Sequence, residues 1–197
     1  MKKVLFMAAL LLVTFSGIAQ AQSSKREADK KERKEAREVK RQDERALEAV
    51  QDTLAFKAAI QALKDQSFVL EANNVVFRNG IMRFVSANTN FVAVNGGQGT
   101  VQTAFRNFTY SPNGLGGVTV QGTVSGVRWN QDKDGNIYYD FSIQGVAISA
   151  TVSIVLTGGT NQASVNINPN FTGNTLMMNG TLVPYEQSNV YQGTQTW

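Results

Sequence analysis

The chain changes character abruptly near Gln66, and this change limits its fold more than any other feature of the sequence. Residues 25–45 carry seventeen charged side chains, whereas residues 66–197 carry only ten. In the second part, turn-forming Gly, Asn and Pro recur every few positions, and no helical pattern is present. The sequence therefore predicts a charged helix followed by an all-β domain.

The N-terminus has the pattern of a secretory signal peptide. Lys2 and Lys3 precede a mostly apolar run at residues 4–18, and Ala-Gln-Ala at residues 19–21 fits the small-residue cleavage site. The apolar run is shorter than the roughly 20 residues that cross a bilayer. We therefore expect cleavage after Ala21 and export, either to the periplasm or as a secreted protein.

Three regions are predicted along the chain: a signal peptide at residues 1–21, a charged α-helix at 22–65 and a β-barrel-like domain at 66–197. Residues 24–64 contain neither Gly nor Pro and consist mainly of strong helix formers. The first half of this helix has too few apolar residues to bury a face. The second half has an apolar stripe that we expect to pack on the β domain: Leu47, Val50, Leu54, Phe56, Ile60 and Leu63.

Charge argues against nucleic acid as a partner. Cleavage of the signal peptide would remove two lysines and lower the net charge from +4 to +2, and residues 66–197 hold five basic and five acidic side chains. A pI near 9.4 is otherwise typical of nucleic-acid binding. Export and the close mixing of both signs in the helix leave no basic stripe for phosphates, so we expect no nucleic acid.

Apolar residues alternate with small or polar ones through most of the β domain, which is the period of a half-buried strand. The alternation is clear at residues 137–143 and 146–156. Asn-Gly and Asp-Gly pairs mark turns between such runs, and Gly126 is expected to form a bulge. The sequence predicts about nine to eleven antiparallel strands in an up-and-down, lipocalin-like barrel or half-barrel. A two-sheet sandwich is the alternative.

Five segments of the chain resemble one known family: FVLEAN (68–73), SANTNF (86–91), NGLGGVTV (113–120), GVAIS (145–149) and LVPYEQSNV (182–190). They are similar to exported proteins from Bacteroidetes catalogued as domain of unknown function 4251. The resemblance covers nearly the whole chain after the signal peptide. It implies a Gram-negative cell envelope and a lipocalin-like barrel, and it supplies no activity and no catalytic residues.

The composition excludes the commonest enzyme designs. Because the chain has no His and no Cys, it has no His-assisted nucleophile and none of the usual structural zinc ligand sets. Glu71, Asp140 and Glu186 are the carboxylates outside the predicted turns, and we interpret them as surface residues. We therefore expect no enzyme activity, no catalytic residues and no cofactor.

One short segment has the spacing of a calcium-binding loop. Asp132, Asp134 and Asn136 occupy alternate positions, as in such a loop. Ile137, however, stands where the loop requires Gly, and Ile143 stands where it requires a bidentate Glu. We interpret the segment as a hairpin turn and expect no metal site.

Aromatic residues are spread over several predicted strands, and inward side chains of a barrel either fill its interior or line a ligand cavity. Filling is the default interpretation. If a cavity exists, the candidate ligand-lining residues are Trp129, Tyr139, Phe141 and Ile143.

These observations predict a non-enzymatic envelope module whose barrel binds a lipid or another small apolar ligand. The alternative is a structural or adaptor protein with a filled barrel that works through its charged helix. In either case the helix could contact an envelope protein or an anionic membrane surface, and such a contact should weaken with salt.

Overall fold

The computed structural model describes residues 2–104, 114–170 and 175–195, with the side chains of the helix described from residue 30 onward. This part of the chain contains one α-helix, nine strands and one 3-10 turn. The elements are α1 (Lys2–Lys64), β1 (Phe68–Phe77), β2 (Met82–Phe84), β3 (Phe91–Asn95), β4 (Gln98–Ala104), β5 (Gly117–Gln131), β6 (Ile137–Gln144), β7 (Ser149–Leu156), β8 (Gln162–Pro169), β9 (Leu176–Pro184) and η1 (Tyr185–Gln187).

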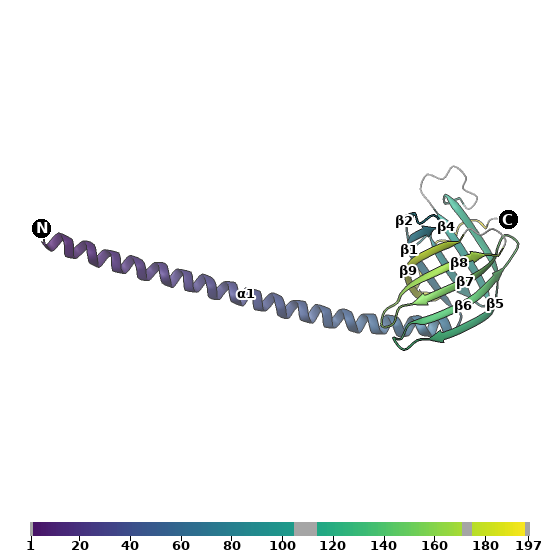
Figure 1. Ribbon diagram of the computed structural model, residues 1–197, viewed down its shortest axis with the longest axis horizontal. Coiled ribbons are helices and arrows are strands. Elements are labelled where there is room, and N and C mark those ends of the chain that lie inside the picture. The colour runs from purple at the N-terminus through teal and green to yellow at the C-terminus, as the bar shows by residue number, and fades with distance from the viewer. Residues whose placement is uncertain (1, 105–113, 171–174, 196–197) are drawn as a thin grey trace. The chain divides into compact units, whose positions relative to one another are not determined.

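Eight of the strands form a closed antiparallel barrel (Figure 1). Strands β3 to β9 pair in chain order, and β1 closes the ring because it pairs with both β3 and β9. Strand β2 is additional, since it pairs only with the second half of β1. The prediction of an up-and-down barrel is confirmed, and the sandwich alternative is wrong.

The up-and-down order gives the barrel two distinct ends. Strand β1 starts at Phe68, just after the helix, and runs away from it to Phe77. The β5–β6 and β7–β8 turns therefore lie at the end where the helix enters, where the Gly158 N–H donates to Asn136 Oδ1 at 2.9 Å. We call this the helix end. The β1–β2 turn, the β6–β7 loop and the start of β9 lie at the opposite end, which we call the distal end.

Two local features of the strands follow from glycine. Gly126 has φ of +66° and lies in the register shift of β5 against β6, so the predicted bulge is confirmed. The strand expected from Val146 begins only at Ser149. The reason is a tight turn in which the Gly145 N–H donates to the Ile148 carbonyl at 2.7 Å. A Cβ at Gly145 would collide with the carbonyl oxygen of Gln121.

The core consists of the inward side chains of the barrel together with the last turns of the helix. Ala59 and Leu63 are fully buried and belong to the same cluster as Phe68 and Tyr139. The helix therefore covers the helix end of the barrel with apolar surface. This burial, and not the helix propensity of the segment, provides most of its stabilisation.

The predicted apolar stripe of the helix is only half correct. Phe56 and Ile60 pack against the core and Leu63 lies within it. Leu54, in contrast, is 61% exposed, and Leu47 and Val50 are exposed as well. Residues 56–63 extend about 12 Å along the helix axis, and they complete the cover of the helix end, so the earlier apolar positions are left on the surface.

Residues 1–50 and residues 51–197 form two separate units. Within the first unit, Lys31 contacts Glu35 at 3.9 Å and Lys40 contacts Glu44 at 3.8 Å, and all four side chains are largely exposed. Exposed pairs one helical turn apart contribute only a few tenths of a kcal/mol each. In the part of the chain that the structure describes, none of the helical sequence is long and apolar enough to cross a membrane.

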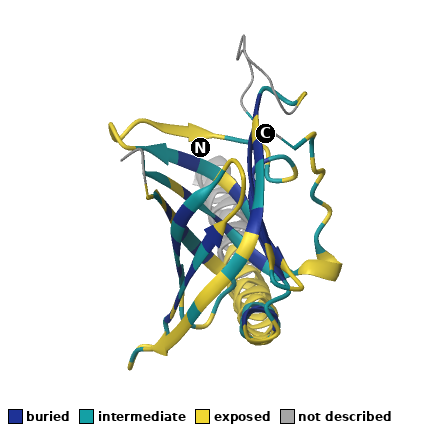
Figure 2. Ribbon diagram, turned by 90° about the vertical axis from the view of Figure 1, so that its right-hand side faces the viewer, coloured by how far each residue is buried: buried dark blue, intermediate teal, exposed yellow. Residues whose placement is uncertain are grey.

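A second, smaller apolar cluster lies on the outer face of the barrel wall. Val69, Phe91 and Ala93 are buried there, with Val183 and Val190 packed against them. Val190 belongs to the C-terminal segment that follows η1, so this segment covers part of the outside of the barrel. In contrast, β2, at the top of the barrel in Figure 1, is exposed along its whole length (Figure 2).

Candidate functional site

Three of the four ligand-lining residues predicted from the sequence, Trp129, Tyr139 and Phe141, pack together toward the helix end of the barrel, whereas Ile143 lies next to the distal end of β6. Tyr139, Phe141 and Ile143 alternate along β6 and are almost completely buried. Trp129 pairs with Tyr139 from β5 and is 38% exposed. The Tyr139 ring meets Trp129 edge-on at 6.3 Å between centroids, Phe141 at 5.8 Å and Phe68 at 5.7 Å. These contacts are core packing, and a ligand-lining role stays a prediction.

The helix contributes directly to this aromatic group. Lys64 Nζ lies 5.9 Å from the centroid of the Trp129 ring, a distance at which a cation is attracted to an aromatic face. Leu63, one residue earlier, belongs to the core cluster that contains Tyr139 and Phe141. Side chains of the helix and of β6 therefore fill the helix end of the barrel.

One polar atom is enclosed in this apolar region. The Tyr139 hydroxyl is buried and has no hydrogen-bond partner among the described residues. Burial raises the pKa of Tyr139 to about 12, because the phenolate would lose its hydration. The side chain therefore stays neutral and carries an unsatisfied hydroxyl, which costs free energy.

The distal end is packed less completely. By register, Val118 shares the inner face with Thr103, and Val120 shares it with Val101 in the core, yet Val118 is 40% exposed. Phe77 and Leu176, which also pair, are only partly buried. Phe68 and Leu156 at the helix end, in contrast, are fully buried.

A depression of about 650 Å³ lies at this end, lined by Phe77, Arg78, Asn79, Thr175 and Leu176. Its walls are apolar side chains of the inner face together with polar groups from the β1–β2 turn, which is the usual make-up of a small-molecule site. We call the inner face of the distal end, which carries Phe77, Leu176 and Val118, the distal site; Phe77 and Leu176 line the depression, and Val118 lies on the same end without lining it. None of these three residues is among the ligand-lining residues predicted from the sequence.

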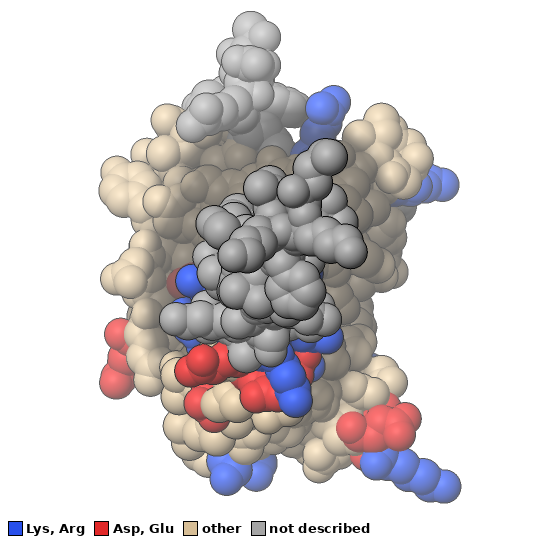
Figure 3. Space-filling view, turned by 90° about the vertical axis from the view of Figure 1, so that its left-hand side faces the viewer, with Lys and Arg blue, Asp and Glu red and all other residues tan. Residues whose placement is uncertain are grey.

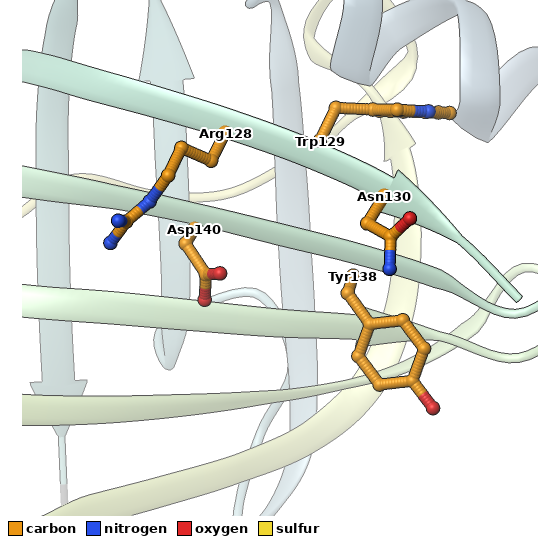
Figure 4. A pocket seen from close by; sticks show the side chains of 5 residues that line it. All are labelled: Arg128, Trp129, Asn130, Tyr138 and Asp140. Carbon is orange, nitrogen blue, oxygen red and sulfur yellow. The ribbon is translucent and has the colours of Figure 1, made fainter.

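A second depression, of about 710 Å³, lies on β5 and β6 and is lined by Arg128, Trp129, Asn130, Tyr138 and Asp140. Arg128 and Asp140 are cross-strand partners on the outer face. Figure 4 shows the Trp129 ring on the opposite side of the strands from Arg128, Asp140 and Tyr138. With four of its five lining residues, all but Trp129, on that outer side, the depression is mainly a hollow over the outer face of β5 and β6.

The segment with calcium-like spacing forms the β5–β6 turn. Asp132 Oδ1 accepts hydrogen bonds from the backbone N–H groups of Asp134 and Asn136, both at 2.9 Å. Asp132 Oδ2 accepts one from Asn136 Nδ2 at 2.8 Å. The side-chain hydrogen bond from Asn136 is the main cause that lowers the pKa of Asp132. Both carboxylate oxygens of Asp132, which would be the ligands of a metal ion, thus accept hydrogen bonds that stabilise the turn.

The other carboxylates considered above lie on the outside of the barrel. Glu71 accepts a hydrogen bond from Ser188 Oγ at 2.6 Å and so joins β1 to the C-terminal segment. Asp140 lines the outer hollow described above, and Glu186 is exposed on η1. Across the described ranges, no three side chains of the types His, Cys, Asp and Glu gather closely enough to hold a metal ion.

The closed eight-stranded antiparallel barrel, covered at one end by an N-terminal helix, defines the class of protein. The family model described as "Domain of unknown function (DUF4251)" matches residues 50–182. The chain belongs to this family. No curated protein matches it.

A solved structure supports the same assignment. The crystal structure of a DUF4251 family protein from Bacteroides eggerthii DSM 20697 is similar to this chain, with 55% sequence identity and a TM-score of 0.62. The match covers 72% of this chain and 95% of the crystallised one. The crystallised protein therefore consists almost entirely of the region shared by the two chains.

Proposed function

We propose that the protein is a non-enzymatic module of the cell envelope that binds a lipid or another small apolar ligand at the distal site. The observation that supports this most strongly is the difference between the two barrel ends. At the helix end Phe68, Tyr139 and Leu156 are almost completely buried and the inward ring of Trp129, at 38%, is partly exposed, whereas at the distal end Val118 is 40% exposed and Phe77 and Leu176 are only partly buried. An inward apolar side chain that stays accessible to solvent is stabilised when an apolar ligand covers it.

The shape of the barrel makes a site of this kind suitable for a single narrow ligand. An eight-stranded barrel encloses only enough space for its own side chains or for one small molecule. Here the helix end is filled by residues such as Tyr139 and Leu63. A ligand would therefore enter only part of the barrel, from the distal end, with Phe77 and Leu176 against its apolar portion.

Export to the periplasm or the exterior is part of the same proposal. Two lysines followed by an apolar run and Ala-Gln-Ala support it at the N-terminus. The similar protein of known structure comes from Bacteroides. A cell-envelope location would place the protein close to membranes, where apolar ligands are available.

An adaptor is the competing function. Two observations favour it: the packed core around Tyr139 and the exposed helix surface over residues 30–51. In an adaptor the charged helix would be the interaction surface and the distal site would have no ligand.

Displacement of a fluorescent fatty acid by unlabelled fatty acid distinguishes the two functions. Val118→Glu places a charge on the inner face of β5, where we expect a loss of affinity of at least tenfold, or about 1.4 kcal/mol. Thr123→Glu is the matched control, because Thr123 is exposed on the outer face of the same strand. If the wild type does not bind the probe, or if both variants bind it equally well, the proposal is wrong.

A further inference from the structure

The distal end carries a group of exposed apolar side chains. Their exposed fractions are 48% for Ile81, 53% for Met82, 86% for Phe84, 86% for Val146 and 40% for Met177. They come from the β1–β2 hairpin, the β6–β7 loop and the start of β9, which all lie at this end. Ile81, Met82, Phe84 and Met177 lie in or beside the neighbouring strands β2, β1 and β9, whereas β7 and β8 separate Val146 from β9. Single exposed apolar residues are common on any protein, but a neighbouring set marks an interaction surface. We call these five residues the apolar rim.

Strand register brings part of the apolar rim into a continuous row. Val76 lies in β1, between β2 and β9. It pairs with Met82 of β2 on one side and with Met177 of β9 on the other. Phe84 lies two residues beyond Met82 and therefore on the same face of β2. Because β2 is a short edge strand with every residue exposed, its side chains project without cover.

The charged side chains beside the apolar rim are basic. Arg78 in the β1–β2 turn and Arg83 in β2 are both exposed. The sequence has no Asp or Glu between Glu71 and Asp132, and none between Asp140 and Glu186. The described connections at the distal end, residues 78–81 and 145–148 among them, fall within these two intervals and therefore carry no acidic side chain.

The acidic residues lie toward the other end of the barrel. Asp132 is in the β5–β6 turn at the helix end, and Glu186 follows β9 at the same end. On the face drawn in Figure 3, the coloured side chains at the upper end are blue basic ones, whereas red acidic and blue basic side chains both lie lower down. The barrel is therefore polarised, with an apolar and basic distal end.

We propose that the apolar rim, together with Arg78 and Arg83, docks the distal end of the barrel onto a membrane that contains anionic lipids. Exposed apolar side chains at such a surface enter the boundary between headgroups and acyl chains, where aromatic rings such as that of Phe84 are favoured. Arginines beside them are attracted to anionic headgroups within a Debye length. This docking does not depend on the barrel holding a ligand.

Co-sedimentation with lipid vesicles tests the proposal on the chain without residues 1–21. Binding is expected to vesicles of phosphatidylglycerol and phosphatidylcholine in equal parts, and not to phosphatidylcholine alone. Replacing both arginines (Arg78→Gln with Arg83→Gln) should weaken binding roughly 25-fold, since each basic residue near an anionic surface contributes about fivefold. Arg128→Gln with Lys133→Gln is the matched control and should bind like the wild type.

Tryptophan fluorescence locates the contact. Phe84→Trp should show an emission shift to shorter wavelength when the anionic vesicles are added, because the ring leaves water. Tyr138→Trp, on the outer face of β6 and 40% exposed, should show none. The proposal is overturned if the wild type ignores anionic vesicles, as it would if a protein partner covers the apolar rim. It is also overturned if Lys30→Gln with Lys31→Gln in the helix abolishes binding while the double arginine variant retains it.

Discussion

The side chain of Gln102 joins the C-terminal segment to the barrel wall, because its Nε2 donates a hydrogen bond to the carbonyl oxygen of Tyr191 at 2.8 Å. Its Oε1 accepts hydrogen bonds from the Gly193 N–H at 2.8 Å and from Thr119 Oγ1 at 2.7 Å. The carboxamide thus offers the C-terminal segment a donor and an acceptor, as a peptide unit of a neighbouring strand would. This holds the segment over the outer cluster that contains Phe91.

Replacing Gln102 with Leu should release the C-terminal segment. Gln102 is fully buried, so its loss leaves several polar partners unsatisfied, and we expect the free energy of unfolding to fall by about 3 kcal/mol. Urea denaturation measures this change, and hydrogen exchange at Gly193 should become fast. Gln121→Leu is the control, since the Gln121 side chain donates a single long hydrogen bond among the described residues, to Thr100 Oγ1 at 3.3 Å. An unchanged exchange rate at Gly193 in Gln102→Leu would show that the segment is held by other contacts.

Two leucines of the same helix should differ sharply in their contribution to stability. Leu63 is fully buried in the core, whereas Leu54 is 61% exposed. Leu63→Ala should therefore lower the free energy of unfolding by about 3 kcal/mol through lost burial and the cavity that remains. Leu54→Ala should change it by no more than about 0.5 kcal/mol. Chemical denaturation of both variants measures the difference, and similar values for the two would contradict the packing of the helix on the barrel.

Removing the Tyr139 hydroxyl should make the protein more stable. The hydroxyl is buried with no partner among the described residues, and the ring packs edge-on against its neighbours. Tyr139→Phe keeps the ring contacts and removes the unsatisfied group, so we expect a gain of about 1 kcal/mol at neutral pH. Thermal unfolding measures this change. A loss of stability of similar size would mean that the hydroxyl has a favourable partner in the folded protein.

The same tyrosine should make the wild type sensitive to alkali. Its pKa rises from 10.0 to about 12 in the folded protein because of burial. A raised pKa favours the protonated form in the folded state, so this stability is complete below pH 10 and is lost as the pH rises through about 12. The loss amounts to about 3 kcal/mol, at 1.36 kcal/mol per pH unit. Tyr139→Phe should lack this part of the alkaline transition in denaturation curves, and an identical transition in both proteins would contradict it.

Acid should weaken the β5–β6 turn through Asp132. The pKa of Asp132 lies below its ordinary value of 3.8, mainly because Asn136 donates a hydrogen bond to the carboxylate. A lowered pKa favours the ionised form in the folded state, so its contribution is present above about pH 4 and is lost as the pH falls through the lower folded value. Asp132→Ala should therefore reduce the Tm at pH 7 and converge with the wild type in strong acid.

Asp134→Ala provides the control for this prediction. Asp134 lies in the same exposed turn, but its carboxylate accepts no hydrogen bond from the described residues. Its replacement should change the Tm little at either pH. A constant difference between Asp132→Ala and the wild type across the acid range would contradict a role for the ionised carboxylate.

The strands were predictable because the inner face of the barrel is mostly apolar. The alternation of apolar and polar residues at 137–143 correctly predicted β6, and Gly126 correctly predicted the bulge in β5. Both features depend only on residues close together in the sequence. Closure of β1 on β9 depends on contacts between distant parts of the chain. The sequence suggested it only through the length of the strand predicted at residues 146–157 and the general advantage of a sheet without exposed edges.

Features set by the ends of the barrel could not be predicted in the same way. The spacing of Leu54 and Leu63 is equally helical, yet only the position of the barrel end decides which of the two is buried. Phe91 lies on the outer face of the barrel and is nevertheless buried, because the C-terminal segment packs over it. No local sequence pattern predicts that the segment packs there. The distal site was missed because alternation indicates which face a residue occupies and not how well that end of the barrel is filled.

A crystal structure with a bromine-labelled fatty acid tests the central claim most directly, since anomalous scattering locates the bromine without ambiguity. The account predicts a bromine peak inside the distal end of the barrel, beside Phe77, Val118 and Leu176, with the side chains around Tyr139 unmoved. A bromine peak beside Tyr139, or a barrel without bound fatty acid in crystals grown at saturating ligand, would contradict it.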